Sequence, residues 1–338
     1  MHSARLWKSL DGGAVGCRLC NHFCRIEDGE RGTCGVRQNS GGQLMTLVYD
    51  KVAAINLDPV EKKPLYHFHP GSSTFSVGTM GCNFACTFCQ NETLSQTPKA
   101  KGRVDGETVA PDLLVRSALK HQASSLSYTY SEPTIFFELV QDTAKLAKEE
   151  GLKNILVSNG FMSGDGLDEL APVVDAANVD LKAFTEAFYR EHCGARLKPV
   201  LDNLKRIREL GWWLEVTTLI IPGLNDSREE LQELTAFMAG ELGTNVPWHI
   251  SRFHPAHRMT DRPPTPVRTL EQAFDIGKQA GLEYVYLGNV PGHRSETTLC
   301  SQCGAPVLER RGFASQPAKT VQGRCPDCGN PIPGRGLP

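Results

Sequence analysis

Eleven of the twelve cysteines in this 338-residue sequence fall into three short groups, and that grouping limits the possible folds more than any other feature. The groups are Cys17, Cys20, Cys24 and Cys34, then Cys82, Cys86 and Cys89, and finally Cys300, Cys303, Cys325 and Cys328. Grouped cysteines predict disulfides in a small secreted chain, but metal ligands or reactive thiols in a long chain without a secretion signal. Residues 1–13 lack the apolar stretch of a signal peptide, so we expect reduced thiols that bind iron or zinc. The single Cys193 is expected to be a buried or merely tolerated thiol.

The composition is that of a folded globular protein, with 40% hydrophobic and 22% charged residues. No apolar run approaches the ~18–20 residues that a membrane-spanning helix needs. The formal net charge of -2 argues against nucleic acid or an anionic membrane as a partner. We therefore expect a soluble, cytoplasmic protein.

Between residues 72 and 290, short apolar segments alternate with segments of helical periodicity. Strands are expected at 73–79, 123–130, 154–158, 177–181, 212–221, 246–253 and 283–287, and helices at 108–121, 134–150, 166–172, 197–210, 227–240 and 268–280. Repeated strand–helix units predict a parallel α/β sheet, here a partial (β/α) barrel of the TIM type, with its chemistry at the carboxyl ends of the strands. The predicted domains are an N-terminal four-cysteine module with lead-in (1–70), the partial barrel (71–292) and a zinc-ribbon-like module (293–338).

The middle cysteines offer three thiolates within eight residues, directly after the first strand of the barrel. Three ligands are one short of a closed tetrahedral zinc site, and one short of the four that a [4Fe–4S] cluster usually takes. A cluster with three protein ligands keeps one iron open, which is a property of catalytic sites. A zinc loop completed by a distant histidine is the structural alternative.

The spacing C-x3-C-x2-C, with the aromatic Phe88 before the last cysteine, resembles the radical S-adenosylmethionine (SAM) superfamily. The resemblance implies that Cys82, Cys86 and Cys89 bind a [4Fe–4S] cluster whose open iron chelates SAM. In that family an electron from the cluster cleaves SAM to methionine and a 5′-deoxyadenosyl radical, which abstracts hydrogen from a substrate. The resemblance also implies a reducing partner such as flavodoxin or ferredoxin.

Further positions match the family at successive strand ends. Glu132 would hold the SAM ammonium, although Tyr130 and Ser131 stand where the family has two glycines. Ser158 and Asn159 occupy the place of the ribose- or carboxylate-binding groups. Each match alone is weak, since Glu-Pro can begin a helix and Asn-Gly can form a turn; their sequential placement makes the pattern specific.

Two later strand ends complete the candidate site. Asp180 and Lys182 are similar to the Asp-Ile-Lys segment of glycyl-radical-activating enzymes, where the alternative is a solvated pair. Arg252 and His254 share one face of the strand at 246–253. Side chains inside a barrel are normally apolar, so a polar face there calls for an explanation. Contact with SAM or substrate is one explanation, and a capping hydrogen bond at the barrel mouth is the other.

Four segments (58–72, 81–91, 128–134 and 288–298) resemble more closely the radical SAM enzymes of the AmmeMemoRadiSam group, within the wider relatives of the pyruvate formate-lyase activating enzyme. This resemblance implies no particular reaction. The kinship with activating enzymes favours a protein or peptide substrate over a small metabolite. Two other classes remain to be weighed: a non-catalytic iron–sulfur or zinc redox protein, and a zinc-dependent nucleic-acid-binding protein.

The outer cysteines predict metal sites with four ligands each. In the C-terminal group, two C-x2-C pairs separated by 21 residues and followed by glycines favour structural zinc. In the N-terminal group, zinc and a second [4Fe–4S] cluster for electron relay both fit, with Cys34–Gly35 resembling a zinc knuckle. Neither saturated site is expected to perform catalysis.

Overall fold

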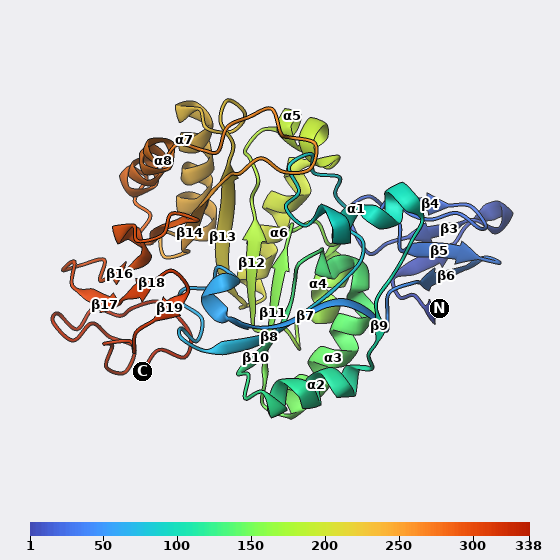
Figure 1. Cartoon of the computed structure of the whole chain (residues 1–338), viewed down its shortest axis with the longest axis horizontal. Helices are drawn as coiled ribbons and strands as arrows, with labels where there is room; N and C mark the ends of the chain where they lie inside the picture. The colour runs from blue at the N-terminus through green and yellow to red at the C-terminus, as the bar shows by residue number, and fades with distance from the viewer.

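The computed structural model describes all residues 1–338 and has a mixed α/β fold built on one nine-stranded sheet (Figure 1). Its strand order is β15-β14-β13-β12-β11-β10-β8-β7-β9, and every neighbouring pair from β8 to β15 is parallel. The strands are β7 (Lys51–Pro59), β8 (Ser73–Thr79), β9 (Glu107–Thr108), β10 (Ser125–Tyr128), β11 (Lys153–Ser158), β12 (Ala176–Asp180), β13 (Trp213–Ile220), β14 (Trp248–Arg252) and β15 (Val285–Gly288). The predicted central parallel sheet is thus confirmed.

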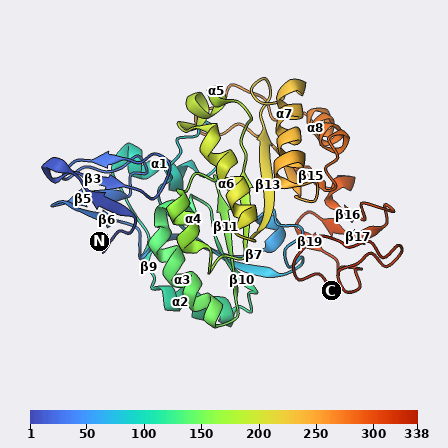
Figure 2. The same cartoon turned by 180° about the vertical axis from the view of Figure 1, so that it is seen from behind.

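Helices connect these strands and cover the sheet, with α3, α4 and α6 seen in front of it in Figure 2. They are α1 (Glu92–Lys101), α2 (Pro111–Lys120), α3 (Phe137–Glu149), α4 (Gly164–Leu170), α5 (Glu186–Phe188), α6 (Leu197–Glu209), α7 (Arg228–Phe237) and α8 (Val267–Gln279). A serine caps α7: Ser227 Oγ accepts a hydrogen bond from Glu230 N at 3.2 Å. None of the helices is long and apolar enough to cross a membrane.

Strands β7 and β9 and helix α1 are among the elements that the sequence did not predict. Strand β7 pairs antiparallel with β8 and extends the sheet, although it falls within the segment 1–70 predicted to be a separate module. The short β9 pairs with β7, and α1 follows the middle cysteines. Helix α1 has low amphipathicity and contains Pro98, so helical periodicity did not reveal it.

Small antiparallel sheets lie at the two ends of the molecule (Figure 1). The N-terminal end contains β1 (His2–Ser3), β2 (Trp7–Ser9), β3 (Val15–Cys17), β4 (Arg25–Ile26), β5 (Arg37–Ser40) and β6 (Gln43–Thr46). The C-terminal end contains β16 (Thr298–Leu299), β17 (Pro306–Leu308), β18 (Arg310–Arg311) and β19 (Ala314–Ser315). The domain boundaries stay a prediction.

Buried polar contacts fix the C-terminal end against the sheet. Arg310 is 7% exposed, its guanidinium lies 4.2 Å from the centre of the Tyr66 ring, and it also donates to Thr298 Oγ1 at 2.8 Å. The imidazole of His67 contacts the carbonyl oxygen of Pro333 through Nδ1 at 2.7 Å and the hydroxyl of Tyr286 through Nε2 at 2.6 Å. A carbonyl can only accept, so Nδ1 carries the proton and Nε2 accepts from the tyrosine.

Candidate active site

A cavity of ≈ 710 Å³ opens at the carboxyl ends of the parallel strands. Nine of the eleven side chains predicted for the central site line it: Cys82, Cys86, Phe88, Cys89, Glu132, Ser158, Asn159, Asp180 and Lys182. They come from the loop after β8 and from the ends of β10, β11 and β12. Parallel strands bring their carboxyl ends to one edge, which is why residues up to 100 positions apart meet here.

The loop that carries the three cysteines is held from several directions. The thiol of Cys82 accepts a hydrogen bond from Phe84 N at 3.3 Å, and Cys89 Sγ lies 3.1 Å from Ser95 Oγ of α1. Burial raises the pKa of the Cys82 and Cys89 thiols, so uncharged thiols are favoured until a metal group binds and displaces the protons.

Cys193, which the sequence left outside the site, lies beside the loop. Its carbonyl accepts a hydrogen bond from Ala85 N at 2.8 Å, and its side chain is fully buried. The neighbouring Cys193 thiol, followed by burial, raises the pKa of Cys86 well above its usual range. A lone cysteine far along the sequence gave no signal of this proximity.

Glu132 is 1% exposed and accepts four hydrogen bonds. Its Oε1 accepts from Thr134 N (3.0 Å), Thr134 Oγ1 (2.6 Å) and Ser158 Oγ (2.8 Å), and its Oε2 accepts from Asn159 N (2.8 Å). Burial raises the pKa of Glu132, and these donors oppose the shift. The carboxylate therefore connects the end of β10 to the end of β11. Its Oε1 accepts three hydrogen bonds, whereas its Oε2 accepts only one.

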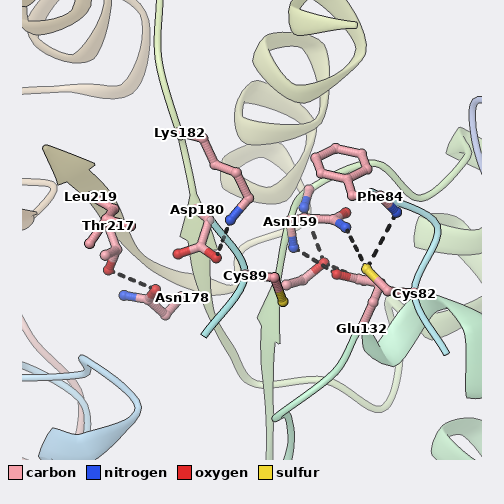
Figure 3. Close-up of polar contacts among 12 residues, drawn as sticks. Cys82, Phe84, Cys89, Glu132, Asn159, Asn178, Asp180, Lys182, Thr217 and Leu219 are labelled. Carbon is pink, nitrogen blue, oxygen red and sulfur yellow. Dashed lines mark hydrogen bonds and ion pairs between the residues drawn. The ribbon is translucent and has the colours of Figure 1, made fainter. Parts of the chain in front are cut away.

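Asn159 joins this carboxylate to the cysteine loop (Figure 3). Its Nδ2 donates to Asn83 Oδ1 at 2.7 Å and lies 3.8 Å from Cys82 Sγ. The following Gly160 has φ 70°, and a Cβ there would lie 2.8 Å from Val179 Cγ1, so only glycine fits. The Asn-Gly pair of the sequence is thus a tight turn that aims an amide at Cys82.

Tyr130 adopts the left-handed conformation that glycine favours, with φ 69°. Its hydroxyl donates to Asp58 Oδ2 at 2.6 Å and accepts from Asn56 Nδ2 at 3.0 Å. The ammonium of Lys63 lies 4.7 Å from the centre of the tyrosine ring. These contacts to β7 and the segment after it hold a strained backbone in the left-handed conformation.

Two further polar pairs lie in or just after β12 and β13 (Figure 3), and Asp180, Lys182 and Thr217 of these pairs line the cavity. Lys182 Nζ donates to Asp180 Oδ2 at 3.0 Å and lies 5.8 Å from the centre of the Phe88 ring. Burial lowers the pKa of Lys182, but the Asp180 carboxylate and the nearby thiols outweigh it and raise the pKa well above its usual range. Thr217 Oγ1 donates to Asn178 Oδ1 at 2.9 Å.

Arg252 and His254 do not line the cavity, unlike the other predicted side chains. Arg252 donates from Nε to the carbonyl oxygen of Thr265 at 2.8 Å, and His254 is exposed. The cavity face of β14 carries His249 and Ser251 instead. The strand ends at Arg252, so the expected alternation does not reach His254, and alternation alone does not say which face points inward.

Another buried carboxylate orients His249. Glu215 Oε2 accepts from His249 Nε2 at 2.6 Å, and the Glu215 carboxylate also accepts from Tyr66 N, His67 N and Trp213 Nε1. Burial alone would raise the pKa of Glu215, but these partners, His249 above all, lower it. His249, held by this bond, is one of the residues that line the cavity.

The C-terminal cysteines converge on one point. The ligand atoms of Cys300, Cys303, Cys325 and Cys328 all lie within 4.8 Å of one another. The Cys300–Cys328 and Cys303–Cys325 sulfur pairs are each 3.6 Å apart. A tetrahedron with Zn–S bonds of about 2.3 Å has edges of about 3.8 Å, so a single zinc ion fits between these sulfurs.

The N-terminal cysteines have a wider arrangement. Cys17 and Cys34 are each 8% exposed, whereas Cys20 and Cys24 are half-buried. No three of the four bring their sulfurs within 4.8 Å of one another, and the same holds for Cys82, Cys86 and Cys89. Burial raises the pKa of Cys17 and Cys34, and the buried Arg37 guanidinium opposes the shift.

Comparison with known proteins agrees with this geometry. The family model described as the radical SAM superfamily matches residues 76–237. An uncharacterized protein of Methanocaldococcus jannaschii is 42% identical over 337 residues, which cover 98% of this chain and 99% of that protein. A second protein of that organism, described only provisionally as a glycyl-radical enzyme activating enzyme, is 30% identical over 54% of this chain and 68% of its own length. The pyruvate formate-lyase 1-activating enzyme of Escherichia coli K12 is 22% identical over 46% of this chain and 65% of its own length.

Proposed function

The chain belongs to the radical SAM superfamily, and from this premise we propose that Cys82, Cys86 and Cys89 hold the [4Fe–4S] cluster that the family implies. The observation that carries the proposal is the shared cavity: the three thiols line the same ≈ 710 Å³ space as Glu132 and Lys182. A non-catalytic electron carrier needs neither an open ligand position nor a lined cavity beside it. When bound, the cluster supplies the electron that cleaves SAM to methionine and a 5′-deoxyadenosyl radical.

The residues around the thiols fit such an occupant. Cys82, Cys86 and Cys89 do not form a group whose ligand atoms all lie within 4.8 Å, and a cube in which each sulfur binds a different iron does not require one. Ser131 lines the cavity, and its Oγ is buried without a hydrogen-bond partner. Buried polar atoms rarely stay unpaired, so this hydroxyl is available to a polar ligand.

Glu132 and the Ser158–Asn159 turn would bind the amino-acid end of SAM. The less used oxygen of Glu132, Oε2, can accept a hydrogen bond from an ammonium group. The Asp180–Lys182 pair offers a cation and an anion to the substrate. Arg252 and His254, which lie outside the cavity, are not part of this proposal.

A protein or peptide is the proposed hydrogen donor, and a small metabolite is the alternative. The likeness to a protein described as a glycyl-radical enzyme activating enzyme supports the first. The finer assignment to the AmmeMemoRadiSam group rests on the segments 58–72, 81–91, 128–134 and 288–298. We further propose zinc at the C-terminal site, a flavodoxin or ferredoxin as reductant, and the three-part division at residues 70 and 292.

Anaerobic reduction with dithionite in the presence of SAM, followed by measurement of 5′-deoxyadenosine, tests the reaction. The Cys86→Ala variant keeps two of the three ligands and is expected to lose the iron of this cluster and 5′-deoxyadenosine formation together. Cys193→Ala is the matched control, because it removes a buried thiol beside Cys86 and leaves all three ligands in place. Near-full 5′-deoxyadenosine formation by Cys86→Ala would refute the assignment.

Isotope transfer identifies the substrate class. The enzyme is incubated with deuterated cell lysate separated by a size filter, and deuterium in 5′-deoxyadenosine is measured by mass spectrometry. Label from the macromolecular fraction supports a protein or peptide donor. Label from the small-molecule fraction alone would overturn it.

A further inference from the structure

The geometry points to a second [4Fe–4S] cluster, held by Cys17, Cys20, Cys24 and Cys34, that passes single electrons to the group at Cys82, Cys86 and Cys89. We call these four residues the N-terminal cysteine site. Its occupant is argued from the site's own residues, and only the destination of the electron rests on the proposed function.

The N-terminal cysteine site differs from the C-terminal cysteine site in the spacing of its sulfur atoms. Four thiolates on a single zinc ion must lie close together, as those of Cys300, Cys303, Cys325 and Cys328 do. A cube of four irons holds each sulfur on a different iron and sets the sulfurs farther apart. The N-terminal cysteine site has the wider spacing, in common with Cys82, Cys86 and Cys89.

A buried positive charge without enough partners lies beside the site. Arg37 is 1% exposed and pairs through Nη2 with Glu138 at 2.8 Å, while its Nε and Nη1 have no hydrogen-bond partner. The guanidinium is near enough to Cys17, Cys20 and Cys34 to interact with their charges. A metal group with four thiolates is anionic and can accept these unused donors.

The N-terminal cysteine site packs directly against the loop that carries Cys82, Cys86 and Cys89. A Cβ on Gly81, the residue before Cys82, would lie 3.2 Å from the carbonyl oxygen of Cys34 and 2.7 Å from Val36 Cγ1. Gly81 therefore lets the two backbones touch, and its φ of 105° also requires glycine. On the other side, His22 Nε2 contacts the carbonyl oxygen of Asn83 at 2.8 Å.

The burial of the four cysteines indicates the direction in which an electron would travel through the site. Cys20 and Cys24 are half-buried, whereas Cys17 and Cys34 are buried, and the carbonyl oxygen of Cys34 lies against Gly81 of the cysteine loop. A one-electron protein reductant transfers one electron to the N-terminal cluster, which is reduced from the 2+ to the 1+ state. The N-terminal cluster returns to the 2+ state when it passes that electron to the inner cluster. No proton is transferred in either step, and the reductive cleavage of SAM consumes the electron.

Metal analysis of a ligand variant tests the occupant without any activity. The variant Cys82→Ala/Cys86→Ala/Cys89→Ala removes the inner ligands and is isolated and reconstituted anaerobically. We expect it to retain about four irons, the content of one [4Fe–4S] cluster, and to give an electron paramagnetic resonance signal on reduction with dithionite. The same protein with Cys20→Ser and Cys24→Ser added should lose that iron and that signal. Cys300→Ser/Cys303→Ser is the matched control and should keep all iron.

Zinc in place of iron in the triple variant, or iron at the level of a [2Fe–2S] cluster, would overturn the inference. The relay is tested separately with Cys20→Ser/Cys24→Ser in the otherwise native chain. With reduced flavodoxin as donor, 5′-deoxyadenosine formation should slow at least tenfold while equilibrium SAM binding stays unchanged. An unchanged rate would refute the relay. If the native chain does not cleave SAM at all, the proposed function fails, and the iron count of the triple variant still decides the occupant.

Discussion

The sharpest prediction concerns Glu132, because its four hydrogen bonds set both parts of the expected effect. In Glu132→Gln the amide oxygen can replace Oε1, which accepts from Thr134 N, Thr134 Oγ1 and Ser158 Oγ. The amide nitrogen then replaces Oε2 and points its hydrogens at the N–H of Asn159. A buried donor facing another donor leaves the Asn159 N–H without a partner.

The size of each effect follows from this geometry. An unsatisfied buried N–H costs about 1–3 kcal/mol, so the free energy of unfolding should fall by that amount. Loss of the carboxylate charge also removes a charge-assisted bond to the SAM ammonium, worth roughly 1.5–3 kcal/mol. SAM binding should therefore weaken about ten- to a hundredfold.

Calorimetric titration with SAM and urea unfolding measure the two effects, with iron content as the check that the cysteine loop is intact. Thr134→Val is the matched control, since it removes one donor to Oε1 but leaves the charge, Oε2 and Asn159 untouched. It should lower stability slightly and leave SAM affinity near that of the native chain. Unchanged SAM affinity in Glu132→Gln would refute the role of the carboxylate, and equal losses in both variants would show that only local packing matters.

Three further perturbations have defined outcomes. Tyr130→Phe removes the hydroxyl that donates to Asp58 and should cost about 1–2 kcal/mol in urea unfolding; no loss would mean that the ring alone holds the strained backbone. Burial lowers the pKa of His67 from 6.5 to about 4, so the unfolded chain binds the extra proton between these values and stability should fall by about 3 kcal/mol as pH drops through that window. Unfolding of His67→Gln measured over the same window should lack this component, and an identical pH profile would contradict the argument. Cys325→Ser/Cys328→Ser should release one zinc, lower the folding yield and leave iron unchanged; a loss of iron instead would identify that site as a cluster.

The sequence predicted the parallel sheet and most of the cavity for one reason. Apolar runs without alternation form strands buried on both faces, and their carboxyl ends share one edge. Glu132, Asn159 and Lys182 each lie shortly after a predicted strand, which places them at that edge, whereas the family resemblance singled them out as site residues. The position of a residue along a strand does not predict which face of the strand points into the cavity. For this reason His249 lines the cavity, where Arg252 and His254 had been expected.

Other parts of the site depend on contacts that sequence spacing does not encode. Cys193 reaches Cys86 through backbone pairing between two distant segments. Tyr130 could not be read as a substitute for glycine, because the partners that hold its backbone, Asp58 and Asn56, belong to β7, the strand that the analysis missed. The antiparallel β7 was missed because its middle, Ala54–Leu57, is half-exposed or exposed and lacks the pattern of a buried strand.

The buried Glu215 joins the C-terminal end of the molecule to the cavity wall. Its carboxylate accepts from His249, which lines the cavity, and from the backbone of Tyr66 and His67, which contact Arg310 and Pro333. Both oxygens of this buried carboxylate accept two hydrogen bonds each, so the loss of any one donor would cost free energy. The Cys325→Ser/Cys328→Ser variant should therefore loosen the Pro333 contact, then the 66–67 segment, and finally the position of the His249 ring. Glu296, Gly312 and Phe313 also line the cavity, so the C-terminal end of the molecule forms part of its wall.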